Sequence, residues 1–167
     1  MTRDDRDINT YISTDRIWLE VRAKAGTVAI PALFLDRDGT LMEDRGYVST
    51  PEDVVLLPGA ASMVSAANRA GVAVVVVTNQ SGIDRGLFGC LEALLAEGGA
   101  QIDAIAACPF HPDFTPGYAT AQARWRKPNP AMVTELAVRL NVDLERSWLV
   151  GDSPRDIEAG RTGGLAG

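Results

Sequence analysis

The sequence predicts an α/β fold, a three-layer Rossmann-like arrangement in which helices cover both faces of a central parallel sheet. Two observations support this class. Short apolar runs with the length of buried strands recur along the chain. They alternate with segments of helical periodicity, as expected when each parallel strand is followed by a covering helix. The expected strands are 32–36, 72–78, 102–108 and 147–151, and the expected helices are 60–70, 83–97, 131–140 and 154–160.

The first expected strand, 32–36, ends in two carboxylates, Asp36 and Asp38, followed by Gly39. Glycine lets the backbone turn sharply away from the strand. In open α/β sheets, ligands bind at the carboxyl ends of the strands. Asp36 can therefore serve as a nucleophile or metal ligand, and Asp38 as a general acid and base. The alternative is a strand followed by a polar turn, because Asp-Gly is a common turn pair.

Residues 42–51 have turn residues, mixed charge and no sustained periodicity, so they are interpreted as a flap near this site. Arg45 and Tyr47 in this segment could contact a substrate, or they could belong to a solvated loop. Pro58 and Gly59 then lead into the helix 60–70, whose apolar positions follow helical spacing.

Polar residues also follow the later strands. Thr78 and Asn79 end the second strand and precede a turn of small residues, a set of donors suited to an anion. A long proline-containing loop, 109–127, follows the third strand and closes with Arg126 and Lys127 just before a helix. Asp152 and Asp156 follow the fourth strand.

Parallel strands deliver all of these side chains to one edge of the sheet. Asp36 and Asp152 can then hold one Mg²⁺ through oxygen ligands. Thr78 and Lys127 can hold the remaining oxygens of a phosphate. A carboxylate nucleophile, a metal, a cation and a hydroxyl around one phosphate form a phosphoryl-transfer site.

Four motifs in order carry a resemblance to a known family: Asp36-Arg-Asp38-Gly-Thr-Leu, Thr78-Asn-Gln-Ser-Gly, Lys127-Pro, and Gly151-Asp152 with Asp156. The chain resembles the haloacid dehalogenase (HAD) superfamily of phosphatases from about residue 32 to residue 164. Two longer stretches resemble one branch of this superfamily in particular. They are the second motif with its continuation Ile-Asp-Arg-Gly, and the run Arg126-Lys127-Pro-Asn-Pro. They are similar to the branch that contains D-glycero-D-manno-heptose 1,7-bisphosphate phosphatase and histidinol phosphatase.

The resemblance implies a mechanism. Asp36 would attack phosphorus and form an aspartyl-phosphate. Asp38 would protonate the leaving alcohol and then activate the water that hydrolyses the intermediate. Mg²⁺ would bind the carboxylates of Asp36 and Asp152 and the main-chain carbonyl of Asp38.

The resemblance also implies roles in binding. Thr78 and Lys127 would neutralise the phosphoryl group, and Asp156 would orient Lys127 or the metal shell. Asn79 and Arg126 would lie nearer the sugar or a second phosphate. The substrate would be a small phosphorylated sugar or metabolite, with histidinol phosphate as the alternative. An alternative of another class is a non-catalytic phosphate-binding or receiver-like protein.

The chain departs from this branch at two places. Many members carry a structural zinc held by cysteine and histidine pairs that flank the long loop, but here the region reads Cys108-Pro-Phe110-His111 and Ala123-Arg-Trp125. A structural zinc site needs four ligands, so zinc is not expected. The family also continues with a strand after the fourth motif, and that C-terminal strand is expected to be missing. No large cap domain is inserted.

Composition bounds the remaining expectations. The 167 residues predict one domain, 30–167, preceded by an N-terminal extension, 1–29, that is packed on the domain or flexible beside it. Within this extension, residues 17–21 could form a strand. The formal net charge of −6 without a basic patch argues against a nucleic-acid partner. No signal peptide or membrane span is evident, and two cysteines give no disulfide framework. We expect a cytoplasmic protein, either a monomer or a weak homo-oligomer.

Overall fold

The computed structural model describes residues 9–12, 17–46, 50–80 and 85–167. Its strands form one six-stranded sheet in the order β1-β2-β5-β4-β3-β6. Four of these strands, β5, β4, β3 and β6, run parallel to their neighbours in that series. The strands are β1 (Asn9–Ile12), β2 (Trp18–Val21), β3 (Ala32–Leu35), β4 (Ala73–Asn79), β5 (Ala104–Cys108) and β6 (Trp148–Val150).

The parallel strands confirm the predicted α/β class and lie close to the predicted positions. In the register of the sheet, Phe34 of β3 faces Val75 of β4 on one side and Leu149 of β6 on the other. β5 begins two residues later than expected, at Ala104. Asp103 precedes it and is held against β4, because its carboxylate accepts a hydrogen bond of 2.9 Å from the backbone N–H of Val74.

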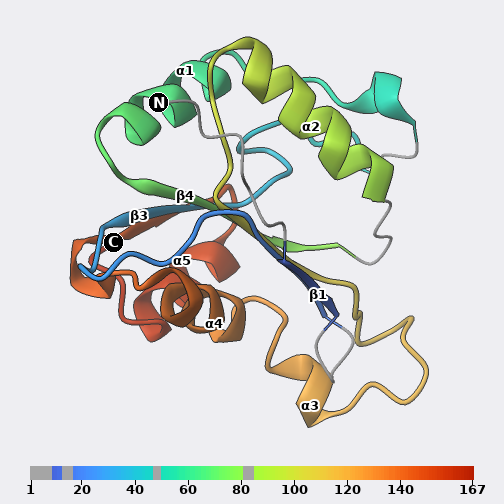
Figure 1. Cartoon of the computed structure of the whole chain (residues 1–167). Coiled ribbons are helices and arrows are strands. Elements are labelled where there is room, and N and C mark those ends of the chain that lie inside the picture. The colour runs from blue at the N-terminus through green and yellow to red at the C-terminus, as the bar shows by residue number, and fades with distance from the viewer. Residues whose placement is uncertain (1–8, 13–16, 47–49, 81–84) are drawn as a thin grey trace.

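The helices cover both faces of the sheet and make the three layers (Figure 1). Adjacent residues of a strand point to opposite faces, so Phe34 packs in one apolar cluster with Leu136, and Leu35 packs in the other with Leu91. On one face lie α1 (Ala60–Arg69) and α2 (Arg85–Glu97), and on the other lie α4 (Ala131–Leu140) and α5 (Pro154–Thr162).

The N-terminal segment adds two strands to the sheet. β2 pairs antiparallel with β5, and β1 pairs antiparallel with β2. Ile17 and Leu19 are fully buried against the core. The sequence indicated a strand near residues 17–21, whereas β1 was not predicted. Together the two strands cover the edge of β5, which would otherwise present unpaired backbone groups.

The opposite edge of the sheet is β6. The last residues of the chain run beside it, because the Ala166 N–H donates to the Ser147 carbonyl and the Leu149 N–H donates to the Gly167 carbonyl, both at 2.9 Å. Trp148 on this edge is 52% exposed. Among the described residues no strand follows β6, and the backbone of Ala166 and Gly167 lies along this edge.

The flap after Asp38 folds back on itself. Glu43 donates to the Val55 carbonyl and Leu57 donates to the Leu41 carbonyl, at 2.9 and 3.0 Å. Leu41, Met42 and Val54 are buried, so the two ends of the flap are anchored on the core, whereas residues 44–46 within it are exposed. Short helices not predicted from the sequence are η1 (Pro51–Asp53), η2 (Leu144–Arg146) and, in the long loop, α3 (Thr120–Ala123).

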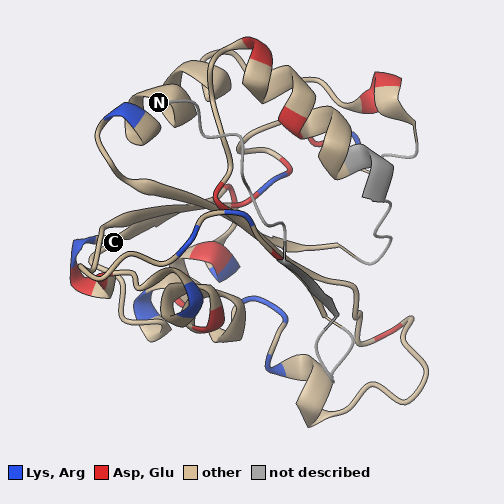
Figure 2. Cartoon of the chain, in the orientation of Figure 1, with Lys and Arg blue, Asp and Glu red and all other residues tan. Residues whose placement is uncertain are grey.

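Charged residues of both signs are spread over many elements (Figure 2). The formal net charge of the whole sequence is −6. Among the described residues, no helix is both long enough and apolar enough to cross a bilayer.

Candidate active site

Three carboxylates converge at the carboxyl ends of β3 and β6. Each of Asp36, Asp152 and Asp156 offers an oxygen, and these oxygens all lie within 4.8 Å of one another. The sheet causes this convergence, because Leu35 of β3 pairs in parallel register with Val150 of β6 and the Asp36 N–H donates to the Val150 carbonyl at 2.9 Å. Residues directly after these two strands therefore meet.

A polar cavity of about 250 Å³ opens above this point. It lies where open α/β sheets bind their ligands. The cavity is lined by Asp36, Asp38, Asp44, Gly46, Thr78, Asn79, Gln80, Lys127, Asp152 and Arg155.

Gly39 makes the close approach of the two acidic loops possible. Its φ is +69°, a left-handed conformation that glycine adopts without strain. A Cβ atom at this position would lie 2.1 Å from Oδ2 of Asp152. Any side chain here would push Asp152 away from Asp36, so the glycine of the first motif also fixes the distance to the fourth motif.

Lys127 forms ion pairs with two of these acids, Asp36 and Asp156. Its side chain is 2% exposed, and its Nζ lies 3.0 Å from Oδ1 of Asp36 and 2.5 Å from Oδ1 of Asp156. Nζ also donates to the Val77 carbonyl at 2.8 Å. Asp156 is fully buried and accepts a further hydrogen bond from the Ser153 N–H at the start of α5. The buried lysine is thus paired with two carboxylates, as a buried charge requires.

Asn79 has a more specific task than the sequence indicated. Its amide forms a reciprocal pair of hydrogen bonds with the main chain of Lys127: Nδ2 donates to the Lys127 carbonyl at 3.0 Å, and Oδ1 accepts from the Lys127 N–H at 2.9 Å. Asn79 therefore fixes the loop that carries the lysine, while its side chain still lines the cavity. Thr78, the preceding residue of β4, is buried and also lines it.

Asp38 is held by two neighbours that were not singled out as site residues. The guanidinium of Arg37 donates from Nε to Oδ1 and from Nη2 to Oδ2 of Asp38, both at 3.0 Å. Nε2 of Gln80 donates to Oδ2 at 2.7 Å. The carboxylate is therefore oriented from two elements, the β3 loop and the end of β4.

Two of the described residues predicted to bind substrate, Arg126 and Arg45, do not line the cavity. Arg126 donates from Nη1 to the Phe110 carbonyl at 2.8 Å and so ties the two ends of the long loop together. Arg45 is exposed and pairs with Glu43. Tyr47 lies outside the described residues. Arg155 and Asp44 line the cavity but were missed; the position of Arg155 between Asp152 and Asp156 was the available signal.

The donor set fits Mg²⁺. Asp36, Asp152 and Asp156 are all carboxylates, the hard oxygen ligands that Mg²⁺ prefers, and Asp152 is exposed to the cavity. Asp156 is fully buried beside Lys127, whereas Asp36 and Asp152 line the cavity, so these two are the carboxylates available to the ion.

Cys108 and His111, which lie in the region compared above with a zinc site, have other surroundings. Burial raises the pKa of the Cys108 thiol, which disfavours the thiolate that zinc binds. Nδ1 of His111 accepts a hydrogen bond of 3.2 Å from the Asp113 N–H, and its ring stacks on Phe114.

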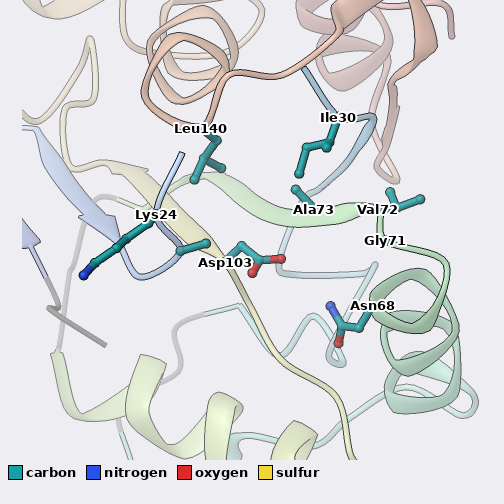
Figure 3. Close-up of a pocket in the computed structure, with 9 residues that line it drawn as sticks. Lys24, Ile30, Asn68, Gly71, Val72, Ala73, Asp103 and Leu140 are labelled. Carbon is teal, nitrogen blue, oxygen red and sulfur yellow. The ribbon is translucent and has the colours of Figure 1, made fainter. Parts of the chain in front are cut away.

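A second hollow lies at the other end of the strands, where β4 and β5 begin (Figure 3). It measures about 110 Å³. Its polar side chains serve the fold: Asp103 bonds to the Val74 N–H, and Asn68 exchanges two hydrogen bonds with the main chain of Gln101. The acidic cavity lined by Asp36, Asp38 and Asp152 is therefore the candidate active site.

Comparison with known proteins gives the family. A family model described as HAD-hydrolase-like matches residues 124–167. D-glycero-beta-D-manno-heptose-1,7-bisphosphate 7-phosphatase of Mesorhizobium japonicum is 44% identical over 161 residues, which cover 90% of this chain and 74% of that protein. The corresponding alpha-heptose enzyme of Burkholderia mallei is 41% identical over 143 residues, which cover 80% of this chain and 76% of that protein.

Solved structures agree. A HAD-like phosphatase from Mesorhizobium loti superposes with a TM-score of 0.77 at 41% identity, over 89% of this chain and 76% of that one. The D,D-heptose 1,7-bisphosphate phosphatase of B. bronchiseptica, complexed with magnesium and phosphate, superposes with a TM-score of 0.70 at 35% identity, over 81% and 78% of the two chains.

The fold and the acidic site thus define a HAD-type hydrolase. The chain belongs to the HAD superfamily, in the phosphatase branch that these relatives represent. It is a phosphatase, which confirms the resemblance drawn from the four motifs.

Proposed function

We propose that the protein is a Mg²⁺-dependent phosphatase that hydrolyses a phosphorylated sugar of the heptose bisphosphate kind through an aspartyl-phosphate on Asp36. The observation that carries this proposal is the placement of Asp36. One of its oxygens lies 3.0 Å from Nζ of Lys127, and the carboxylate lines a polar cavity beside Asp152. A nucleophile, a buried cation and a second carboxylate around one cavity suit phosphoryl transfer.

In the first step, a carboxylate oxygen of Asp36 attacks phosphorus and the bond from phosphorus to the ester oxygen breaks. The electron pair of that bond stays on the ester oxygen, which takes a proton from Asp38 and leaves as the alcohol. Lys127 lies beside Asp36 and offsets negative charge on the phosphoryl oxygens, and Thr78 lines the same cavity.

In the second step, a water oxygen attacks the phosphorus of the aspartyl-phosphate. Asp38, now a carboxylate, takes a proton from this water, and the bond from phosphorus to the Asp36 oxygen breaks. The products are inorganic phosphate and the regenerated Asp36 carboxylate. Asp38 is again protonated, so the two steps restore the enzyme.

The metal would be held by the carboxylates of Asp36 and Asp152, with the Asp38 main-chain carbonyl as the third protein ligand expected from the resemblance. When bound, Mg²⁺ supplies positive charge that neutralises the phosphate and the nearby acids. Asp156 positions Lys127 through their buried ion pair.

The preference for a bisphosphate is supported by the relatives' names and by Arg155. Among the described residues that line the cavity, Lys127 and Arg155 are the cations. Lys127 forms ion pairs with two acids, whereas Arg155 is exposed and donates from Nε to Ser153 Oγ at 3.0 Å. Arg155 is therefore suited to contact a second phosphate. Relatives are named for both heptose anomers, so the anomer is part of the test.

Histidinol phosphate is the second candidate substrate, from the same branch. A receiver-like protein that stores a phosphoryl group is the alternative of another class. In such a protein the aspartyl-phosphate would persist without turnover. We expect the enzyme to act in the cytoplasm as a monomer or weak homo-oligomer.

The test is phosphate release from both anomers of heptose 1,7-bisphosphate, from histidinol phosphate and from an aryl phosphate, with Mg²⁺ or with a chelator. We expect Mg²⁺-dependent release, highest for a heptose bisphosphate, and its loss in Asp36→Asn. Arg155→Met should raise KM for the bisphosphate more than for the aryl phosphate. Turnover that survives Asp36→Asn would overturn the proposal, and a preference for histidinol phosphate would overturn the substrate assignment.

A further inference from the structure

Arg37 stands between the two acids of the first motif and contacts both of them. Its backbone N–H donates to Oδ1 of Asp36 at 2.8 Å. Its guanidinium donates to both oxygens of Asp38 at 3.0 Å. A fork of two parallel N–H donors fixes the plane of a carboxylate as well as its distance.

Burial makes this arrangement specific. Arg37 is only 3% exposed, although its neighbours Asp36 and Asp38 line a polar cavity. Its guanidinium carbon lies 5.5 Å from the centre of the Phe88 ring on α2, and Phe88 is itself buried. A guanidinium held over an aromatic face, away from water, has few alternative orientations. Asp38, by contrast, remains partly open to the cavity that it lines.

Gln80 completes the arrangement from a second strand. Its Nε2 donates to Oδ2 of Asp38 at 2.7 Å, and its own backbone N–H donates to the Cys108 carbonyl at 2.8 Å. The backbone of Gln80, directly after β4, is thus held at the end of β5. Both oxygens of Asp38 are bonded, and the donors come from the residues that follow β3 and β4.

We infer that Arg37 and Gln80 are positioning residues that orient the Asp38 carboxylate for proton transfer in both steps. This inference rests on the proposed function. Neither residue exchanges protons with substrate; each acts through Asp38. Proton transfer depends on hydrogen-bond geometry. If the Asp38 carboxylate is no longer held in one orientation, both steps should become slower. The alternative is an ion pair that supports only the fold.

The two steps depend differently on the leaving group. This difference distinguishes a positioning role of Arg37 and Gln80 from a purely structural one. The leaving group of an activated aryl phosphate is a stable phenolate, which needs no proton from Asp38 in the first step. Water attack in the second step still needs Asp38 as a base. With Asp38 loosened, the aryl ester should therefore react once per site and then stall at the aspartyl-phosphate.

The experiment measures rapid-mix kinetics of Arg37→Met, Arg37→Lys and Gln80→Met with Mg²⁺, using an activated aryl phosphate and an alkyl phosphate. We expect a burst approaching one phenol per folded chain with the aryl ester, and no burst with the alkyl ester. Steady-state kcat should fall about 10- to 100-fold in Arg37→Met, which is less than the roughly 10²–10⁴-fold that general acid–base catalysis contributes, because Asp38 itself is still present. Arg37→Lys keeps the positive charge but loses the paired N–H donors to Asp38, so its kcat should fall nearly as far as that of Arg37→Met.

Gln80→Met leaves the Arg37 fork in place and should show the same burst with a smaller fall in kcat. It also keeps the inference testable if Arg37→Met does not fold. Arg146→Met, a surface change, is the matched control and should leave both substrates unaffected. An equal fall for both esters without a burst, or unchanged kinetics in all three variants, would overturn the inference. Inactive wild-type protein, or turnover that persists in Asp36→Asn, would instead overturn the proposed function.

Discussion

Lys127 offers the sharpest test of the site's electrostatics. Its ammonium lies 3.0 Å from Asp36 and 2.5 Å from Asp156, and Asp156 is fully buried. Lys127→Met keeps an apolar chain of similar length but removes the charge. It leaves Asp156 buried without its cation, and breaking a buried pair in this way costs about 3–5 kcal/mol. For a chain of this size, about 2–4 °C is lost per kcal/mol, so the midpoint of thermal unfolding should fall by roughly 10 °C.

The measurement is urea unfolding at neutral pH in a chelator, followed by tryptophan fluorescence and circular dichroism. Coincident transitions justify a free energy of unfolding. The matched variants are Asp156→Asn and the double variant. In the double variant the uncompensated carboxylate is gone, so it should lose less stability than Lys127→Met alone. A loss under about 1 kcal/mol in Lys127→Met, or strictly additive losses in the double variant, would refute this reasoning.

Two further predictions concern packing and thiol chemistry. Leu19 on β2 is fully buried whereas Ile157 on α5 is 69% exposed, so Leu19→Ala should cost about 2–5 kcal/mol and Ile157→Ala within about 0.5 kcal/mol in urea unfolding. Equal losses would mean that the N-terminal strands do not pack as described. Burial raises the pKa of Cys108, so at neutral pH less of this thiol is thiolate and iodoacetamide should label Cys90 first. Equal labelling rates in the native protein, measured by mass spectrometry, would contradict that burial.

The parallel core could be predicted because its signals are local. A run such as 72–78 is apolar at every position but its last, and only a strand buried on both faces uses such a run. The motif acids follow these strands directly, so the topology alone brings Asp36 and Asp152 together. The short β1 could not be predicted in this way, because its pairing with β2 depends on a hairpin partner and not on its own apolar pattern.

Side-chain partners were harder to predict than positions. Arg126 precedes Lys127 in sequence, yet its guanidinium bonds to the Phe110 carbonyl and not to the cavity. Arg37 follows Asp36, yet its orientation is set by Phe88 on a distant helix. A long charged side chain can reach several partners, so its direction is decided by tertiary packing. Short side chains at strand ends, such as Asp36, have no such freedom.

The central claim is that Asp36 carries the phosphoryl group during turnover. The most direct measurement mixes the protein with Mg²⁺ and an activated aryl phosphate, quenches it in acid within the first turnover, and maps the modified peptide by mass spectrometry. We expect one phosphoryl group on the peptide that contains Asp36, and none in Asp36→Asn. Multiple turnovers with no trapped adduct in any variant that stalls the second step, or an adduct on another residue, would contradict the account.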